Sequence, residues 1–299
     1  MGWKTISIQT EKVKDERLET YLKSISDLCK QECYSKALER IEEAEELPEA
    51  NNDDAKALLC FFKCSVYVLG SMTWKAYSGL SRYSQKIRLY AVCVGIATIK
   101  NSSGSDREDD IKILQYMLSE VIDDVDGDIN MDGFKYTLLS MACYLKQEDI
   151  VRVLLKCGAD SHKKVLSDSG WVDPLWTACV SSTCDAGIAR TLIKYGANVN
   201  ERYASFKNRT CLHQIAAAKH WDSRYMPIYK MLVEEGANVN LQDDDGYTPA
   251  MLSLDQNWFW SAELDMMNYL LKHGARRDIK AKNGSTLNSI AEKNDVVWE

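Results

Sequence analysis

Residues 189–198 read Ala-Arg-Thr-Leu-Ile-Lys-Tyr-Gly-Ala-Asn, and this stretch decides the fold. Apolar residues at helical spacing lead into Gly196, which ends the run. Glycine is the usual residue just past a helix because it takes the left-handed backbone conformation without a steric penalty. The same Gly-Ala element recurs at Gly158, Gly236 and Gly274, at steps of 38, 40 and 38 residues. The sequence therefore predicts a helix that ends in a tight turn, repeated four times along the chain.

A second signal alternates with these glycines and marks the start of another helix. A Thr or an Asp stands just before an apolar run, with Pro at the next position in two of the five cases. Side-chain oxygens of Thr and Asp cap the first helical turn, and Pro suits the first helical position. The five starts are Thr137-Leu138-Leu139, Asp173-Pro174-Leu175, Thr210-Cys211-Leu212-His213, Thr248-Pro249-Ala250 and Thr286-Leu287-Asn288.

These residues resemble the ankyrin repeat, which has a Thr-Pro-Leu-His signature and a period of about 33 residues. The resemblance covers about residues 132–299, with four near-complete units and a fifth that stops after one helix. The apolar run 111–118, followed by 128–130, is interpreted as a degenerate earlier unit. The resemblance implies an all-α helical solenoid of helix-turn-helix units with hairpin loops, not two globules joined by a free linker.

The units depart from the family's pattern by insertions at 162–172, 201–209, 220–227 and 257–263. Insertions in repeat proteins map to loops and often form the binding face. Exposed aromatic side chains in such loops are unfavourable unless a partner or a neighbouring domain covers them. The aromatic residues in these insertions are Trp171, Tyr203, Phe206, Trp221, Tyr225, Trp258, Phe259 and Trp260.

The resemblance also implies where a partner protein would bind, at the hairpin tips and the inner face of the first helices. Trp176 stands where the signature carries His, so packing against the neighbouring repeat and contact with a partner are both open for it. Trp171 lies in an enlarged tip, where we predict binding. The corresponding positions are Phe134, Tyr136, Tyr144, Trp171, Trp176, Val180, Tyr203, Arg209 and Tyr247.

The N-terminal part has helical periodicity over residues 12–100. Residues 34–48 resemble the second helix of a tetratricopeptide repeat, and 55–70 resemble the first helix of the next, although a plain helical cap fits nearly as well. A repeat stack needs such a cap because a terminal repeat otherwise exposes half its core. We therefore predict an α-helical, tetratricopeptide-like domain at 1–105, an acidic segment at 106–131 and ankyrin repeats at 132–299.

Composition and charge exclude several classes of protein. The chain has 299 residues and a net charge of −7, and residues 106–128 contain nine acidic and two basic residues. A nucleic-acid-binding protein usually shows a basic excess, so none is expected as a partner; the basic, Tyr-rich run 74–100 is better explained by a solvated helix than by a stacking surface. No apolar run is long enough to span a membrane, and no secretory signal is present. We expect a monomer in the cytoplasm, with the nucleus left open.

No catalytic or metal-binding pattern stands out. The ten cysteines form no Cys-x-x-Cys pair and are interpreted as reduced, buried thiols. Asp128-x-Asn130-x-Asp132-Gly133 matches the first half of a calcium loop, but Leu139 replaces the closing Glu. His213 is expected to bond loop backbone, as the resemblance implies. We expect no cofactor, no metal and no catalytic residue.

The first hypothesis for function is therefore a non-enzymatic scaffold that binds another protein on its repeats. The alternative is a substrate adaptor for a ubiquitin ligase or a similar complex, docked through the N-terminal helices. An enzyme with a site between the helical domain and the repeats is the third and least favoured class.

Overall fold

The computed structural model describes residues 16–69, 83–99, 105–131, 134–167, 170–180, 184–218, 225–254, 261–294 and 296. Contacts within the chain divide it into two compact units, Met1–Asp160 and Ser161–Glu299, which we call unit 1 and unit 2. Among the described residues, no helix combines the length and apolar content that crossing a bilayer requires.

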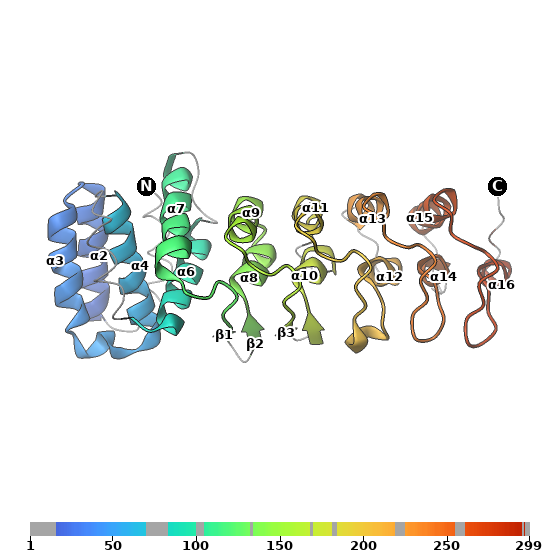
Figure 1. Cartoon of the computed structure of the whole chain (residues 1–299), viewed down its shortest axis with the longest axis horizontal. Helices are drawn as coiled ribbons and strands as arrows, with labels where there is room; N and C mark the ends of the chain where they lie inside the picture. Colours follow the sequence, from blue (N-terminus) through green and yellow to red (C-terminus); the bar gives the residue numbers. More distant parts are fainter. Residues whose placement is uncertain are drawn as a thin grey trace. The chain divides into compact units, whose positions relative to one another are not determined.

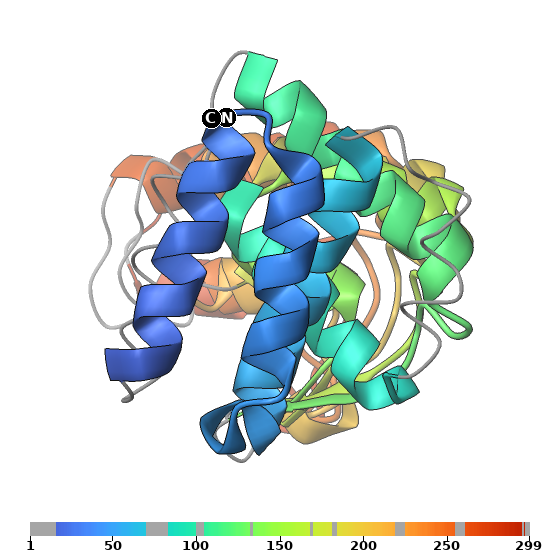
Figure 2. The same ribbon diagram turned by 90° about the vertical axis from the view of Figure 1, so that its left-hand side faces the viewer.

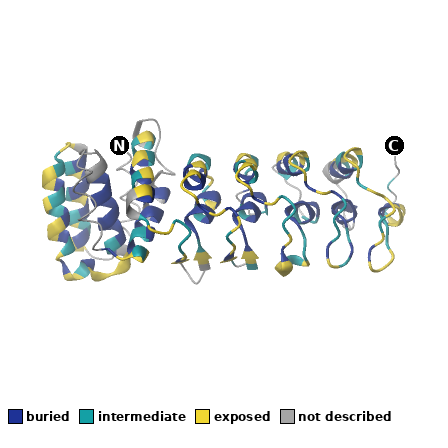
Figure 3. Ribbon diagram, in the orientation of Figure 1, coloured by how far each residue is buried: buried dark blue, intermediate teal, exposed yellow. Residues whose placement is uncertain are grey.

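Unit 1 consists mainly of helices that pack in chain order. Helix α2 contacts α3, α3 contacts α4, and α4 contacts both α6 and α7. Figure 2 shows these helices side by side, in blue to green, and Figure 3 shows that their buried residues face one another. The elements are α2 (Glu16–Lys30), α3 (Tyr34–Glu45), the 3-10 turn η2 (Pro48–Asn51), α4 (Asp53–Leu69), α6 (Gln85–Ile99), α7 (Ser105–Tyr116) and the π-helical turn η3 (Met117–Val121).

The last part of unit 1 contains a hairpin and a helix pair. Strand β1 (Ile129–Met131) pairs antiparallel with β2 (Phe134–Tyr136), and α8 (Leu138–Tyr144) and α9 (Glu148–Lys156) follow. Helix α8 contacts α6 as well as α9. The pair α6 and α7 therefore stands before α8 and α9 in the order expected for a degenerate earlier repeat.

Unit 2 is built from helix pairs separated by hairpin loops (Figure 1). The first helices contact one another in the order α10, α12, α14 and α16, and the second helices in the order α11, α13 and α15. The elements are β3 (Val165–Ser167), β4 (Gly170–Val172), α10 (Pro174–Val180), α11 (Ala186–Lys194), η4 (Ala204–Phe206), α12 (Cys211–Ala216), α13 (Tyr225–Glu234), α14 (Pro249–Leu254), α15 (Ser261–Lys272) and α16 (Leu287–Lys293). This two-layer stack confirms the predicted all-α solenoid fold class.

The predicted helix starts are confirmed by their capping bonds. At Thr137 and Thr286 the hydroxyl accepts a hydrogen bond from the backbone N–H three residues on, and a serine there bonds back to the cap. At Asp173 the carboxylate accepts from the N–H of Trp176 at 2.8 Å. Each bond satisfies one of the donors that a helix N-terminus leaves without an intrahelical partner.

The predicted glycine turns are also confirmed. Gly196 and Gly236 have φ values of 102° and 92°. At both positions the preceding helix closes with a hydrogen bond from the following alanine back to the helix, Ala197 N to Leu192 O at 3.0 Å and Ala237 N to Leu232 O at 2.9 Å. These turns direct the chain out of the second helix toward the next hairpin loop.

Asparagine side chains join successive turns of unit 2. The Asn200 amide donates to the carbonyl oxygen of Gly236 at 3.2 Å and accepts from the N–H of Asn238 at 2.7 Å. One repeat later, Asn240 donates to the Gly274 carbonyl at 2.9 Å and accepts from the N–H of Arg276 at 2.8 Å. These amides fix the spacing of adjacent repeats because each satisfies both a donor and an acceptor of the next turn.

His213 joins a helix cap to the following repeat. Its Nδ1 lies 2.8 Å from the Thr210 hydroxyl, and its Nε2 donates to the carbonyl oxygen of Leu241 at 3.0 Å. The expected bond to loop backbone is confirmed. Burial lowers the pKa of His213 to about 4, although the Leu241 carbonyl opposes that shift. The ring is therefore neutral at pH 7.

The N-terminal helices, the domain boundaries and the burial of the cysteines were also predicted from the sequence. The helices predicted at 34–48 and 55–70 correspond to α3 and α4, while their tetratricopeptide character stays a prediction. The division into 1–105, 106–131 and 132–299 also stays a prediction. One detail is wrong: Cys157 is exposed, because it occupies the C-cap of α9 and not an apolar helix face.

Replacing Gly236 with alanine is expected to destabilise unit 2 by about 1 kcal/mol or more. No atom lies within 4 Å of the added Cβ, so the cost is backbone strain at positive φ alone. The matched control is Gly187→Ala in the first turn of α11, where alanine suits the helix and stability should not fall. Urea unfolding followed by circular dichroism measures both, and equal midpoints for the wild type and the Gly236 variant would contradict the assigned turn.

The stability of the protein is expected to fall between pH 6.5 and pH 4 because of His213. The unfolded histidine takes up its proton near pH 6.5, whereas the folded one does so only near pH 4. Between pH 7 and pH 5 the wild type should therefore lose about 2 kcal/mol of unfolding free energy more than His213→Gln. Urea titrations of both proteins at the two pH values measure this difference. The same pH dependence in the two proteins would show that His213 is not held neutral.

Candidate functional site

The hairpin β3–β4 presents an apolar pair to solvent. Val165 lies opposite Val172 and both are buried, whereas Leu166 lies opposite Trp171 and both are exposed. The exposed fraction is 52% for Trp171 and 39% for Leu166. Successive side chains of a strand point to opposite faces, so the buried valines place the neighbouring pair outward.

The hairpin is held in place by contacts with its own turn and with the next loop. The Ser167 hydroxyl donates to the carbonyl oxygen of Gly170 at 3.0 Å. Gly170 has a φ of 108°, and a Cβ there would lie 2.7 Å from the Ser205 hydroxyl. Only glycine therefore allows the hairpin to approach the loop containing Ser205, and this close approach supports the exposed pair on a packed base.

A buried aromatic cluster joins α10 to the following hairpin loop. The ring centroid of Trp176 lies 4.4 Å from that of Tyr203 and 4.2 Å from that of Phe206, which it stacks against. Trp176 and Tyr203 are buried, while Phe206 is half-buried. Trp176 thus has the packing role that the sequence left open, and neither buried ring offers its surface to a partner.

The hydroxyl of Tyr203 connects this cluster to the cap of α10. It donates to the Asp173 carboxylate at 2.7 Å, and the same oxygen of Asp173 caps the helix. Burial raises the pKa of Asp173, and the hydrogen bonds from Trp176 and Tyr203 oppose this. Burial also raises the pKa of Tyr203 well above its ordinary value, so the phenol stays protonated. This arrangement connects the cap of α10 to the following hairpin loop.

Two further predicted residues, Arg209 and Tyr247, line one cavity of about 350 Å³ in unit 2. The Arg209 guanidinium bonds the buried Asp243 carboxylate at 2.9 Å, and the Tyr247 hydroxyl accepts from Asn283 at 3.0 Å. These bonds fix both side chains on adjacent hairpin loops. The remaining lining residues are Lys207, Asp245, Leu252, Lys282 and Asn283.

The cavity has a mixed charge with a cationic excess. Lys207 pairs with Asp245 at 2.6 Å, and this hydrogen bond, together with the charges of Arg209 and Lys282, lowers the pKa of Asp245. Three cations therefore act on one lining carboxylate. A cavity of this kind suits a polar or acidic side chain of a partner better than an apolar one.

Four predicted residues remain, three in unit 1 and one in unit 2. Tyr136 and Tyr144 belong to unit 1, where Tyr136 pairs with Ile129 across β1–β2 and Tyr144 is 50% exposed at the end of α8. Phe134 forms part of β2, but its side chain lies outside the described residues. Val180 is half-buried at the end of α10.

Sequence reasoning missed Leu166, although it did include the loop that carries it. Leu166 stands two residues after the pair Lys163-Lys164, in a run of only two apolar residues. The signal that finds it is a pair of short β-prone runs, Val165-Leu166 and Trp171-Val172, with Ser, Asp and Gly residues between them in the sequence. Trp221, Trp258, Phe259 and Trp260 lie outside the described residues.

The described residues offer no site for a metal ion. No group of three or more His, Cys, Asp or Glu side chains among them is placed to bind one. Asn130, part of the half-matching calcium loop, lies in strand β1 opposite Lys135, while residues 132 and 133 are outside the described part.

Comparison with known proteins agrees with the fold. The family model for ankyrin repeats in three copies matches residues 175–283, and the single ankyrin repeat model matches residues 134–164. Alpha-latrocrustotoxin-Lt1a of Latrodectus tredecimguttatus is 29% identical over 151 residues, which are 50% of this chain and 9% of the toxin. Ankyrin repeat protein FPV031 of Fowlpox virus (strain NVSL) is 30% identical over 145 residues, 48% of this chain and 38% of that protein.

A solved structure supports the same fold. The crystal structure of the ankyrin repeat protein EF0377 has a TM-score of 0.53 and 20% sequence identity, and covers 70% of this chain and 93% of its own. The chain spans well under two thirds of the length of the two curated relatives. Ankyrin repeats form a protein–protein interaction module that is typically not enzymatic. Residues 134–164 and 175–283 are ankyrin repeats, and through them the chain belongs to the ankyrin-repeat proteins.

Proposed function

We propose that the chain is a non-enzymatic scaffold that binds a partner protein on the hairpin side of unit 2. The observation that carries this proposal is the exposed pair Leu166–Trp171, which lies on a hairpin whose opposite face is buried. Large apolar side chains held outward on a rigid support favour association, because a partner can cover them without reordering the loop.

The cavity lined by Arg209 and Tyr247 supplies the polar part of the same binding surface. Interfaces combine a few apolar anchors with polar groups that set specificity. Here the anchors are Trp171 and Leu166, and the polar groups are the side chains on the loops that follow in unit 2. Trp176 and Tyr203 stabilise this surface from behind, so they belong to the site as supports and not as contacts.

The adaptor hypothesis remains the second candidate. The feature that favours it is that unit 1 forms its own helical core and its own groove, described below, separate from the repeats of unit 2. A chain with one module for a client and another for a ligase subunit or similar machine has the organisation that an adaptor needs.

Trp171→Ala is expected to weaken partner binding roughly thirtyfold or more, about 2 kcal/mol, with little change in melting temperature. Half of this side chain is exposed in the free protein, so its removal costs little folding stability. The matched control is Tyr195→Ala, an aromatic residue of unit 2 that is 39% exposed at the C-cap of α11. Affinity capture with the wild type and both variants, quantified by mass spectrometry, identifies the proteins whose recovery depends on Trp171 and provides the partner for titration.

Equal recovery with the wild type and Trp171→Ala would contradict this binding surface. If Trp258→Ala or Trp260→Ala abolishes binding without unfolding while Trp171→Ala binds normally, the partner uses the opposite edge of the repeats. Ligase subunits that remain bound to Trp171→Ala while one client is lost would favour the adaptor, and loss of a single client alone would favour the scaffold.

A further inference from the structure

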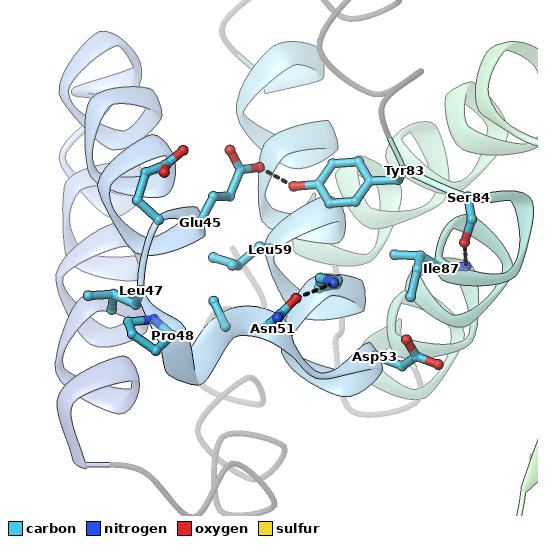
Figure 4. Close-up of a pocket in the computed structure, with 12 residues that line it drawn as sticks. Glu45, Leu47, Pro48, Asn51, Asp53, Leu59, Tyr83, Ser84 and Ile87 are labelled. Carbon is cyan, nitrogen blue, oxygen red and sulfur yellow. Dashed lines mark hydrogen bonds between the residues drawn. The ribbon is translucent and has the colours of Figure 1, made fainter.

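A groove of about 590 Å³ lies in unit 1, between the end of α3, the turn η2 and the starts of α4 and α6 (Figure 4). Its floor is apolar and consists of Leu47, Leu59 and Ile87, each more than nine-tenths buried. This volume is in the range of pockets that accommodate a small molecule or a few side chains of a peptide.

One residue that lines this groove is cationic, Lys56, and it is hydrogen-bonded to a neighbouring residue. Lys56 donates to the amide oxygen of Asn51 at 2.7 Å. Beside the groove, Lys86 pairs with Asp53 at 2.5 Å. The lining thus contains one cation, Lys56, against the three carboxylates of Glu45, Glu46 and Asp53, and it carries a net negative charge.

The carboxylate of Glu45 is neutralised from within the unit. The buried Lys63 ammonium lies 3.3 Å from both of its oxygens, and the Tyr83 hydroxyl donates to it (Figure 4). Burial lowers the pKa of Lys63, and the charge of Glu42 opposes that shift. The buried Lys63 therefore interacts with two carboxylates of α3, those of Glu42 and Glu45.

Glu46, by contrast, forms no salt bridge with a described residue, and it belongs to a stripe along α3. Glu39, Glu42 and Glu46 are exposed and stand three and four residues apart, so they lie on one face of the helix. Lys36 stands three residues before Glu39, on the same side of the helix. The stripe leads directly into the groove because Glu46 is one of the lining residues.

Glu49 adds a further carboxylate beside the groove, and one of its oxygens accepts no hydrogen bond. It stands between the lining residues Pro48 and Ala50, and its Oε2 is covered without accepting a hydrogen bond from any described residue. Covering a carboxylate oxygen without a donor is unfavourable unless a positive group approaches.

We propose that this groove binds a basic amphipathic segment of a partner protein, with a bulky apolar side chain on Leu47, Leu59 and Ile87 and Lys or Arg side chains along Glu39, Glu42 and Glu46. A segment of this kind fits the groove because its apolar side chain would cover the apolar floor and its cations would pair with Glu39, Glu42 and Glu46. The same carboxylates would repel an acidic segment. This site is distinct from the repeat surface of unit 2, and it does not depend on a partner being bound there.

The test uses the full chain and a fluorescein-labelled peptide of about 14 residues, with Lys and Leu at helical spacing. Fluorescence polarisation at about 0.1 M salt measures its affinity, and a peptide with Glu in place of every Lys is the probe control. We expect the Lys peptide to bind at least tenfold more tightly than the Glu peptide. Binding should weaken as salt rises because the contacts at the rim are exposed.

Two variants test the position of the peptide. Glu42→Lys/Glu46→Lys should weaken binding at least tenfold, and Asn51→Trp, which fills the groove from an exposed lining position, at least fivefold. The matched control, Asp265→Lys/Glu292→Lys, makes the same change in net charge at exposed positions of unit 2 and should leave affinity unchanged within twofold. Melting temperatures establish that all variants fold.

Three results would overturn the proposal. Equal loss of affinity in both double variants would show attraction to the net charge of the chain and not to the groove. Unchanged affinity in Asn51→Trp would place the peptide outside the groove. A wild-type dimer that Glu42→Lys/Glu46→Lys converts to a monomer, measured by light scattering, would assign the groove to a second copy of the chain.

Discussion

The structure depends on the left-handed turn that follows the second helix of each repeat. At Gly236 the chain reverses its backbone twist, and the carbonyls at the helix end are closed by the next N–H groups. The turn sets where the following hairpin loop starts, and the Asn200 and Asn240 amides then fix one repeat against the next. A helix pair cannot bury its apolar face alone. Because these local bonds place each pair against the next one, they allow the stack to bury a continuous apolar core.

The proposed binding role of Trp171 depends on a hairpin that holds its side chain in one position. Val165 and Val172 anchor the hairpin from one face, and Ser205 contacts it where Gly170 leaves room. A flexible loop with the same residues would collapse onto the surface or pay an ordering cost on binding. In the proposed binding surface, the buried valines and Ser205 are the groups that support the hairpin on which Trp171 stands.

Local patterns could be predicted from the sequence because their causes are local. The caps at Thr137 and Thr286 and the turns at Gly196 and Gly236 each depend on residues within one helical turn. The buried state of Trp176 could not be predicted, because Tyr203 and Phe206 reach it from the next repeat. The groove of unit 1 was missed for a similar reason: its floor joins side chains from three separate elements.

The two units, each with one candidate surface, differ in net charge. Residues 1–160 have a net charge of −6 and residues 161–299 a net charge of −1. In unit 2 some hairpin charges are paired across neighbouring loops, as in Lys164–Glu201 at 2.6 Å and Arg209–Asp243 at 2.9 Å. Exposed pairs such as Lys164–Glu201 contribute little to stability, whereas Arg209 pairs with the buried Asp243, and both kinds of pair reduce the net charge of the repeat surface. On α3, Glu45 pairs with Lys63 and Glu43 with Arg40, whereas Glu39, Glu42 and Glu46 form no salt bridge with a described residue. This stripe therefore keeps a negative charge that attracts cations over a distance.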